Sequence, residues 1–396
     1  MNKRKIFNDP VYGFIAIPYD IVFDVVEHPY FQRLRRIQQL GLSSLVYPGA
    51  THSRFHHSLG AMHLMQRSLE VLKSKGVKLT DDDCQAAILA ILLHDIGHGP
   101  FSHALEGILV ENVSHEEISL MLMQELQKEF GEPLQTAIQI FTDTHPKKFL
   151  HQLVSGQLDM DRMDYLNRDS FYTGVSEGVI GYDRIINMLD VYNGNVVVEE
   201  KGIYSVEKFL IARRLMYWQV YLHKTSLIAD LMLKNAILRV KNTKGSHQKC
   251  SHALNWFLQQ SIGKNEIRNG LKNYVLVDDI DIMQALKNWC ASEDKILQIL
   301  ASSIVDRNLF KIEFLDEDKT ALKYNELQQI YSEEEMQYLV LKGTAVNNAY
   351  DPQKDNIHIK FKDGSIKAIS EISEQLSIRS VSKPVIKHYI AYPKNA

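Results

Sequence analysis

A histidine–aspartate pair at the end of an apolar helix limits what this chain can fold into. The segment Ala86–Leu93 carries only apolar side chains, and His94 and Asp95 follow it directly, before Gly97 and Gly99 break the chain. Burying an imidazole and a carboxylate is costly unless each group has a partner. A divalent metal ion is one such partner, because it binds neutral imidazole nitrogen and ionised carboxylate oxygen together. The pair therefore predicts a helical core built around a polar, metal-binding centre.

Two further segments supply the same ligand types. His57 lies in a His-rich sequence at the start of a predicted helix, and Asp161 lies in the acidic run 159–164. The predicted metal ligands are His57, His94, Asp95 and Asp161. Such a metal would lower the pKa of a coordinated water and polarise a phosphoryl oxygen. Manganese, iron, zinc, nickel and cobalt all suit these ligands, so ligand chemistry does not select one. The alternative interpretation is a set of hydrogen-bonded polar residues in a helical core.

Charge and cysteine content exclude several classes of protein. The 396 residues can form one large core and a smaller second domain. The 45 Lys and Arg residues nearly balance the 48 Asp and Glu residues, which argues against a dedicated nucleic-acid binder. The three cysteines are widely separated and form no CxxC pair, so neither a disulfide framework nor a thiolate metal site is expected. We find no signal-peptide pattern and no membrane-spanning apolar run, so the expected location is the cytoplasm.

Helical periodicity dominates the chain up to about residue 304. The predicted helices cover residues 31–40, 57–75, 118–130, 205–240 and 278–300, and Asp81–Asp83 begin the helix that leads to His94. Beyond them, residues 309–314 and 357–361 alternate between apolar and polar side chains as strands do. Asp363-Gly364 indicates a turn after the second of these strands. The pattern favours a mainly α protein whose C-terminal part contains strands.

Three motifs in order resemble one known enzyme family. They are RFHHSLG at 54–60, HDIGHGPFSH at 94–103, and DMDRMDY at 159–165 followed by Arg168-Asp169. The chain resembles the HD-domain phosphohydrolases, and within them the deoxynucleoside triphosphate (dNTP) triphosphohydrolases. The resemblance runs from about Lys5 to Leu233 and becomes faint beyond that point.

The resemblance implies a fold and its division. We expect a mainly α fold with an HD-domain helical core and a smaller C-terminal α+β module. The HD-type catalytic domain would cover residues 1–265, with its metal-binding core at about 31–235. The C-terminal α+β module would cover residues 266–396.

The resemblance also implies catalytic roles for residues that follow the His-Asp pair. His98 and His103 are expected to contact the phosphate where water attacks, and His103 is the candidate proton donor to the leaving oxygen. His115 is expected to act with Glu106 as an acid–base element, although the start of a helix disfavours the charged imidazolium. The alternative for each of the first two histidines is a helix-capping or surface residue.

Further residues resemble the family's substrate contacts. The expected triphosphate contacts are Arg54, Arg162, Arg213 and Lys224. Arginine suits this role because its guanidinium makes two parallel hydrogen bonds to phosphate. The expected contacts at the sugar end are Gln39, Tyr165, Asp169 and Tyr221. Gln39 and Asp169 would bind the 3′-hydroxyl, and Tyr221 would exclude a 2′-hydroxyl. Arg213 and Lys224 would otherwise form a solvated helix face, and Tyr221 would be a core residue.

The N-terminal segment 5–13 resembles a site where relatives bind an activating nucleotide between subunits. The residues in question are Lys5, Asn8, Glu27, Gln32 and Arg35, with Glu27 standing where those relatives have aspartate. The resemblance implies a homo-oligomer, either a dimer or a tetramer, and an activating nucleotide. The alternative is that this segment only packs against the core.

These features together predict a metal-dependent hydrolase of dNTPs that is similar to a dGTPase. Attack at the α-phosphorus would release a deoxynucleoside and inorganic triphosphate, and Mg²⁺ could accompany the triphosphate. One alternative is an HD-family nucleotidase or phosphodiesterase that acts on other nucleotides. Another is a nucleotide-sensing or nucleic-acid-binding regulator with weak catalysis, whose partner would be single-stranded nucleic acid. The sequence does not rank the four dNTPs.

Overall fold

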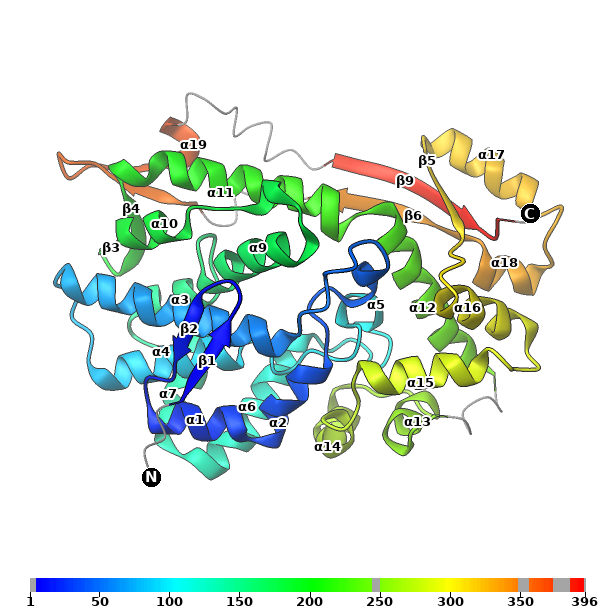
Figure 1. Cartoon of the computed structure of the whole chain (residues 1–396), viewed down its shortest axis with the longest axis horizontal. Helices are drawn as coiled ribbons and strands as arrows, with labels where there is room; N and C mark the ends of the chain where they lie inside the picture. The colour runs from blue at the N-terminus through cyan, green and yellow to red at the C-terminus, as the bar shows by residue number, and fades with distance from the viewer. Residues whose placement is uncertain (1–4, 244–249, 348–355, 373–384, 395–396) are drawn as a thin grey trace.

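Three helices that pack together carry the predicted metal ligands. The computed structural model describes residues 5–243, 250–347, 356–372 and 385–394, except for the side chains of His103 and Asn347. Helix α3 (Arg54–Ser74) packs against both α4 (Asp81–Leu93) and α9 (Met160–Thr173) (Figure 1). A capping box of Thr80 and Asp83 begins α4, whose residues 86–93 are all buried. The apolar run thus holds the following His-Asp pair inside the core.

The other elements surround these three helices. In the N-terminal half they are β1 (Ile6–Asp9), β2 (Gly13–Ala16), α1 (Asp20–Glu27), α2 (Pro29–Gln32), η1 (Arg33–Arg36), η2 (Gly41–Leu45), α5 (Ser102–Leu105), α6 (His115–Phe130), α7 (Glu132–Phe141), α8 (Lys148–Val154), η3 (Ser176–Gly178), α10 (Tyr182–Met188), β3 (Leu189–Tyr192), β4 (Asn195–Glu199) and η4 (Glu200–Gly202). In the C-terminal half they are α11 (Ile203–Met216), η5 (Tyr217–Tyr221), α12 (Lys224–Asn242), α13 (His252–Leu258), α14 (Lys264–Tyr274), α15 (Asp279–Trp289), α16 (Lys295–Val305), β5 (Lys311–Leu315), α17 (Glu317–Leu327), α18 (Glu333–Leu339), β6 (Leu341–Asn347), β7 (His358–Lys360), β8 (Ile366–Ala368), α19 (Ile369–Ile372) and β9 (Val385–Tyr392). The protein is therefore mainly helical with small sheets, as the sequence predicts.

The helix predicted over residues 31–40 is wrong in its second half. Helix α2 ends at Gln32, and the 3₁₀ turn η1 that follows it ends at Arg36. The backbone at Ile37 is extended. The amide of Gln38 then donates to the Asp279 carboxylate at 2.7 Å, and the amide of Gln39 donates to the His52 carbonyl at 2.9 Å. These tertiary hydrogen bonds replace the helical ones, and neither partner is close in sequence.

The long helix predicted over residues 205–240 is also wrong, because it is broken. Helix α11 passes into the π turn η5, in which the amide of Leu222 donates to the carbonyl of Tyr217. His223 is extended, and its Nδ1 accepts from the amide of Thr225 to begin α12. The break brings η5 and the first turns of α12 to the same cavity.

The strands in the C-terminal part form two small sheets. Strand β9 pairs antiparallel with both β5 and β6, and Figure 1 shows this sheet with α17 and α18 at one end of the molecule. In the second sheet, β7 pairs parallel with β4 and antiparallel with β8. The two predicted strands are confirmed as β5 and β7, and the Asp363-Gly364 turn joins β7 to β8.

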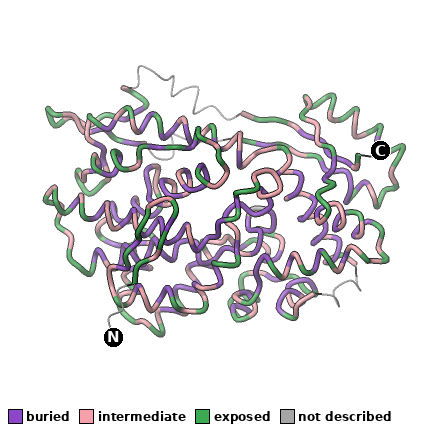
Figure 2. Tube along the Cα trace, viewed as in Figure 1, coloured by how far each residue is buried: buried purple, intermediate pink, exposed green. Residues whose placement is uncertain are grey.

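The main hydrophobic core is one cluster of buried side chains, drawn from segments between Ile15 and Ala391. Figure 2 shows in purple where the buried residues lie along the trace. Residues beyond 265 also contact the centre, since Tyr274 donates to the carbonyl of Gly97 and Asp279 accepts from the amide of Phe101. The predicted domain boundary at residue 265 stays a prediction. Within the described residues, no helix combines the length and apolar character that crossing a membrane requires.

Candidate active site

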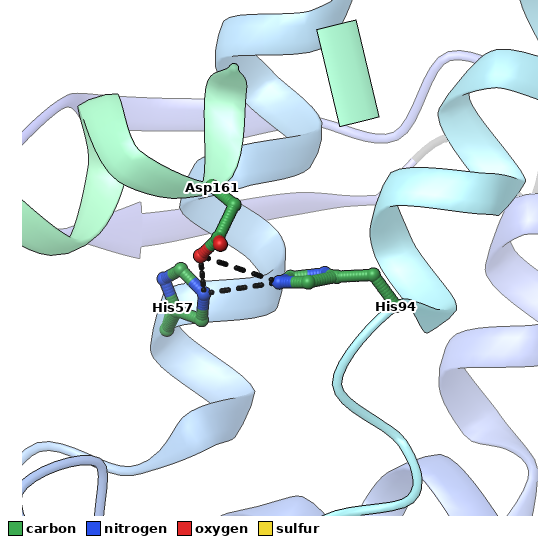
Figure 3. Close-up of side chains that lie close together, drawn as sticks. All are labelled: His57, His94 and Asp161. Atoms are coloured by element: carbon green, nitrogen blue, oxygen red, sulfur yellow. Dashed lines mark hydrogen bonds and ion pairs between the residues drawn. The ribbon is translucent and has the colours of Figure 1, made fainter. Parts of the chain in front are cut away.

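Three of the predicted metal ligands converge on one point. Nε2 of His57 lies 3.1 Å from Oδ1 of Asp161 and 3.4 Å from Nε2 of His94 (Figure 3). Nε2 of His94 lies 3.4 Å from the same Asp161 oxygen. Donor atoms about 2.1 Å from one ion in tetrahedral or octahedral geometry lie roughly 3.0–3.4 Å apart. The residues present therefore fit a divalent metal ion.

The opposite nitrogen of each imidazole is fixed by the protein. Nδ1 of His57 lies 2.7 Å from Oδ2 of Asp164, and Nδ1 of His94 lies 2.6 Å from the carbonyl oxygen of Ile91. A proton on each Nδ1 satisfies these contacts and leaves the Nε2 lone pair for a metal. The sequence analysis missed Asp164, although it closes the acidic run and lies one turn after Asp161.

The electrostatic environment of His57 favours a cation. Burial lowers the pKa of His57, but its hydrogen bonds with Asp161 and Asp164 outweigh burial and raise the pKa to about 10. The carboxylates that hold a proton there would also hold a divalent ion.

Asp95, the fourth predicted ligand, lies beside these three residues. Its Oδ1 is 3.3 Å from Nε2 of His94 and 3.2 Å from Nε2 of His98. Its Oδ2 is 3.7 Å from Nε2 of His57 and accepts from Nη1 of Arg54 at 2.5 Å. Burial raises the pKa of Asp95, but the neighbouring imidazoles and guanidinium outweigh burial and hold the pKa well below its usual range. Asp95 therefore contacts both His94 of the metal centre and His98 beyond it.

His98, His115 and Glu106 form a group next to Asp95. The two imidazole rings stack with centroids 3.8 Å apart, and Nδ1 of His115 lies 2.7 Å from Oε1 of Glu106. That hydrogen bond is the main cause that lowers the pKa of Glu106 to about 2. Burial lowers the pKa of His115, but the hydrogen bond with Glu106, together with the charges of Asp95 and Glu116, outweighs burial and raises it. His103, the predicted proton donor, lies on α5, and its side chain is outside the described residues.

A cavity of about 660 Å³ joins these groups to most of the predicted substrate contacts, and this volume is typical of small-molecule sites. The predicted residues that line it are Gln39, Arg54, Asp95, His98, Glu106, His115, Asp161, Arg162, Tyr165, Asp169, Arg213 and Tyr221. Lys224 is an exception. It is the exposed first residue of α12 and is not among the lining residues, so its contact with the triphosphate stays a prediction.

The predicted sugar contacts form a connected group. Oδ2 of Asp169 accepts from the Tyr221 hydroxyl at 2.8 Å, and Oδ1 lies 2.8 Å from Nε2 of His52. The rings of Tyr165 and Tyr221 meet edge to face at 6.0 Å. Gln39 is buried beside them, and its Oε1 has no hydrogen-bond partner among the described residues. The sequence analysis missed His52, which no motif identifies.

Two of the three arginines that line the cavity are already hydrogen-bonded to the loop before α9. Arg162 pairs with Asp159 and with the carbonyl of Gly156, and Arg213 donates to Gln157 at 3.1 Å. Tyr217, Leu227, Asp230, Leu231 and Lys234 also line the cavity and were not predicted. They escaped prediction because a continuous helix gives no reason to turn these residues toward the site.

The candidate regulatory residues lie near the N-terminus in two pairs. Nζ of Lys5 lies 3.0 Å from Oε1 of Glu27, and Nε of Arg35 donates to Gln32 at 2.8 Å. Asn8 is exposed on β1. The structure thus brings the predicted residues near one another in pairs, and nucleotide binding there stays a prediction.

Comparisons with known proteins agree with this geometry. Residues 54–169 match the family model described as an HD domain, and residues 180–255 match an HD-associated region. The chain is 31% identical to the uncharacterized protein YwfO of Bacillus subtilis, over 100% of this chain and 93% of that protein. It is 52% identical to a phosphohydrolase of Bacteroides thetaiotaomicron, whose crystal structure matches 98% of this chain and 99% of that chain with a TM-score of 0.92.

A more distant relative has a named activity. The chain is 30% identical to the deoxynucleoside triphosphate triphosphohydrolase SAMHD1 homolog of Dictyostelium discoideum, over 59% of this chain. The match covers 49% of that protein, so this chain spans about half of it. The His-Asp centre, the domain match and the full-length relatives together show that the chain belongs to the family of HD-domain phosphohydrolases.

Proposed function

We propose that this protein hydrolyses dNTPs at the α-phosphorus and releases a deoxynucleoside and inorganic triphosphate. One observation carries the proposal: Asp95 and Asp161 of the metal centre, the His98–His115–Glu106 group and the expected sugar contacts line one cavity. A metal at the predicted ligands would suit attack of water on a phosphorus. Arg162 and Arg213 would bind the phosphates on one side of that atom, and Asp169 would bind the sugar on the other. The similarity to a named dNTP triphosphohydrolase supports the same substrate class.

The residues next to Asp95 provide for the proton that the reaction needs. The bound metal would supply an activated water and an electrophile for the phosphoryl oxygen. The leaving 5′-oxygen needs a proton when its bond to phosphorus breaks. His115 is suited to hold this proton because Glu106 raises its pKa. His103 is the second candidate donor. Arg54, held by Asp95 and Ser102, would contact the phosphate beside the metal.

The other side of the cavity accounts for the choice of a deoxynucleotide. Asp169 and Gln39 would bind the 3′-hydroxyl, and the free acceptor of Gln39 fits this role. Tyr221 is held against Asp169 by its own hydroxyl, so its ring would lie fixed beside the sugar. A fixed ring leaves no volume for a 2′-hydroxyl. Arg162 and Arg213 would bind the β- and γ-phosphates through charge-assisted hydrogen bonds.

The experiment that tests this function measures products from each substrate. The purified full-length protein is incubated separately with the four dNTPs and the four NTPs, each with Mn²⁺, Fe²⁺, Zn²⁺, Ni²⁺, Co²⁺ or Mg²⁺. We expect triphosphate and a deoxynucleoside from at least one dNTP. Hydrolysis confined to monophosphates or cyclic nucleotides would replace the proposal with a nucleotidase or phosphodiesterase. Nucleotide or single-stranded nucleic-acid binding without turnover would indicate a regulator.

The proposal includes a homo-oligomer that an additional nucleotide activates at the N-terminal residues. The Lys5–Glu27 and Arg35–Gln32 pairs support it, because they place charged and polar groups near one another in the N-terminal part of the chain. Light scattering with and without each nucleotide tests this part. A fully active monomer at micromolar concentration would contradict it.

A further inference from the structure

A chain of buried charged groups runs from the β1–β2 hairpin to the metal centre. Oδ2 of Asp9, at the end of β1, accepts from Nη1 of Arg168 at 2.7 Å. Arg168 then makes a two-pronged contact with Asp164, from Nε to Oδ2 and from Nη2 to Oδ1, each at 3.0 Å. Oδ2 of Asp164 lies 2.7 Å from Nδ1 of His57. Three contacts therefore connect a residue of the hairpin to a predicted metal ligand.

This chain is shielded from water and tightly held. The side chains of Asp164 and Arg168 are 0% exposed, and that of Asp9 is 4% exposed. A side chain at Gly60 of α3 would collide with both the Asp164 carboxylate and the Arg168 guanidinium, so this position has no room for a Cβ. Charges in such an environment interact strongly, because little solvent screens them.

The hairpin fixes Asp9 independently of Arg168. Oδ1 of Asp9 accepts from the amides of Val11 and Tyr12, each at 2.9 Å, in the turn between β1 and β2. The ring of Tyr12 also lies under the Arg168 guanidinium at 5.4 Å. The position of the Asp9 carboxylate thus depends on the conformation of the hairpin turn.

We propose that Asp9 and Arg168 are positioning residues that hold His57 in the orientation required to bind the metal. Asp164 can accept fully from Nδ1 of His57 only if Arg168 does not draw the carboxylate away. Asp9 shares the guanidinium charge and so limits that pull. The hairpin therefore tunes the affinity of a metal centre to which it contributes no ligand. The inference rests on the proposed metal centre and not on the identity of the substrate.

The test measures metal affinity in the full-length protein rather than turnover. The protein is freed of metal with a chelator, and the Kd for Mn²⁺ and for Co²⁺ is measured by competition with a chromophoric chelator. Asp9→Asn keeps the size of the side chain but removes its charge. We expect it to weaken metal binding about tenfold, the lower end of the effect of residues behind metal ligands. Asp9→Glu keeps the charge and should recover most of the affinity.

A control separates positioning from stability. Phe14→Ala changes the same hairpin at a side chain that is 74% exposed, so it should leave the Kd unchanged. The melting temperature of each metal-free variant and its rise on adding Mn²⁺ are measured in parallel. A positioning role predicts a smaller metal-induced rise for Asp9→Asn than for the wild type. If Asp9→Asn does not fold, Arg168→Lys replaces it, because lysine keeps the charge but loses the fork to Asp164.

Two outcomes would overturn the inference. One is a variant that melts earlier but binds Mn²⁺ and Co²⁺ as the wild type does, because the contacts would then be structural only. The other is equal loss of affinity in Phe14→Ala. Neither outcome would count against the proposed dNTP hydrolysis. Conversely, if the protein hydrolyses no dNTP, the measured metal affinities would still test the role of Asp9.

Discussion

The two ends of the cavity are built differently. At the metal end, each side chain is held by a neighbouring protein group at 2.5–2.7 Å. The partner is Asp164 for His57, the Ile91 carbonyl for His94 and Arg54 for Asp95. At the substrate end, the guanidinium groups of Arg162 and Arg213 are engaged with the loop before α9 and would have to exchange those contacts to bind phosphate. The metal end is therefore organised in advance, whereas the substrate end would have to adapt to what it binds.

This difference separates chemistry from substrate choice. The predicted metal ligands come from α3, from α9 and from the turn directly after α4, and α3 packs against both α4 and α9, so the core sets their positions. The substrate end depends on η5 and α12, which meet at a break in the helix. Substitutions should therefore abolish activity at the first end and change specificity at the second.

The largest effect is expected from loss of a metal ligand. His94→Ala and Asp95→Ala each leave an incomplete metal site, and hydrolysis should fall on the order of 10³-fold or more, because the metal contributes several kcal/mol to the barrier. Metal content and kcat are measured together. His252→Ala, at an exposed histidine of α13, is the control and should behave as the wild type. Full metal occupancy with normal turnover in either variant would show that the ligand assignment is wrong.

A smaller effect is expected for the cavity arginines. Arg213→Ala removes a charge-assisted hydrogen bond of about 1.5–3 kcal/mol, so kcat/KM for a dNTP should fall roughly tenfold to a hundredfold. Lys224→Ala is the matched control, because Lys224 is exposed and outside the cavity. Equal losses in the two variants would show that Lys224 also contacts the triphosphate.

The sugar contacts should change specificity more than rate. Tyr221→Ala opens space beside the sugar, so kcat/KM for an NTP should rise relative to that for the matching dNTP by about tenfold. Asp169→Ala should weaken both substrates, because both carry the 3′-hydroxyl. An unchanged NTP-to-dNTP ratio in Tyr221→Ala would mean that Tyr221 is only a core residue.

The smallest effect is expected on the pH profile. Glu106 raises the pKa of His115, so His115 stays protonated to a higher pH than an ordinary histidine, and proton donation is lost as the pH rises through that raised pKa. Glu106→Gln should move the basic limb of kcat/KM to lower pH. Glu125→Gln is the control, because Glu125 lies on the same helix α6 but pairs with Lys128. A basic limb that stays in place in Glu106→Gln would remove His115 from proton transfer.

The same pair should make stability depend on pH. With its raised pKa, His115 contributes stability that is fully present below its ordinary pKa and is lost as the pH rises through the folded-state pKa. The difference in melting temperature between wild type and Glu106→Gln should therefore shrink toward high pH. A difference that grows instead would contradict the assigned charge states.

The metal end could be predicted from the sequence, but the substrate end only in part. His57, His94, Asp95 and Asp161 lie in contiguous motifs, and the motif residues alone indicate a metal. Asp164 was within reach of the same reasoning, because it continues that acidic run. His52 and Asp230 were not, because their roles depend on a tertiary contact with Asp169 and on the break before α12.

The fold shows the same limit. The helix over 118–130 and the strands near 309 and 357 follow from local periodicity, and the structure confirms them. The helix over 31–40 failed because Asp279, far along the chain, accepts from the amide of Gln38. Local patterns carry no information about such a partner.

Hydrolysis in ¹⁸O-labelled water tests the proposed reaction most directly. Attack of water on the α-phosphorus with departure of the 5′-oxygen puts one ¹⁸O atom into triphosphate and none into the deoxynucleoside. A chelator removes the metal once hydrolysis has taken place, and mass spectrometry then measures the ¹⁸O content of both products. We expect triphosphate with a single label. Label in the deoxynucleoside, or dNMP and pyrophosphate as the first products, would contradict hydrolysis at the α-phosphorus with a nucleoside leaving group.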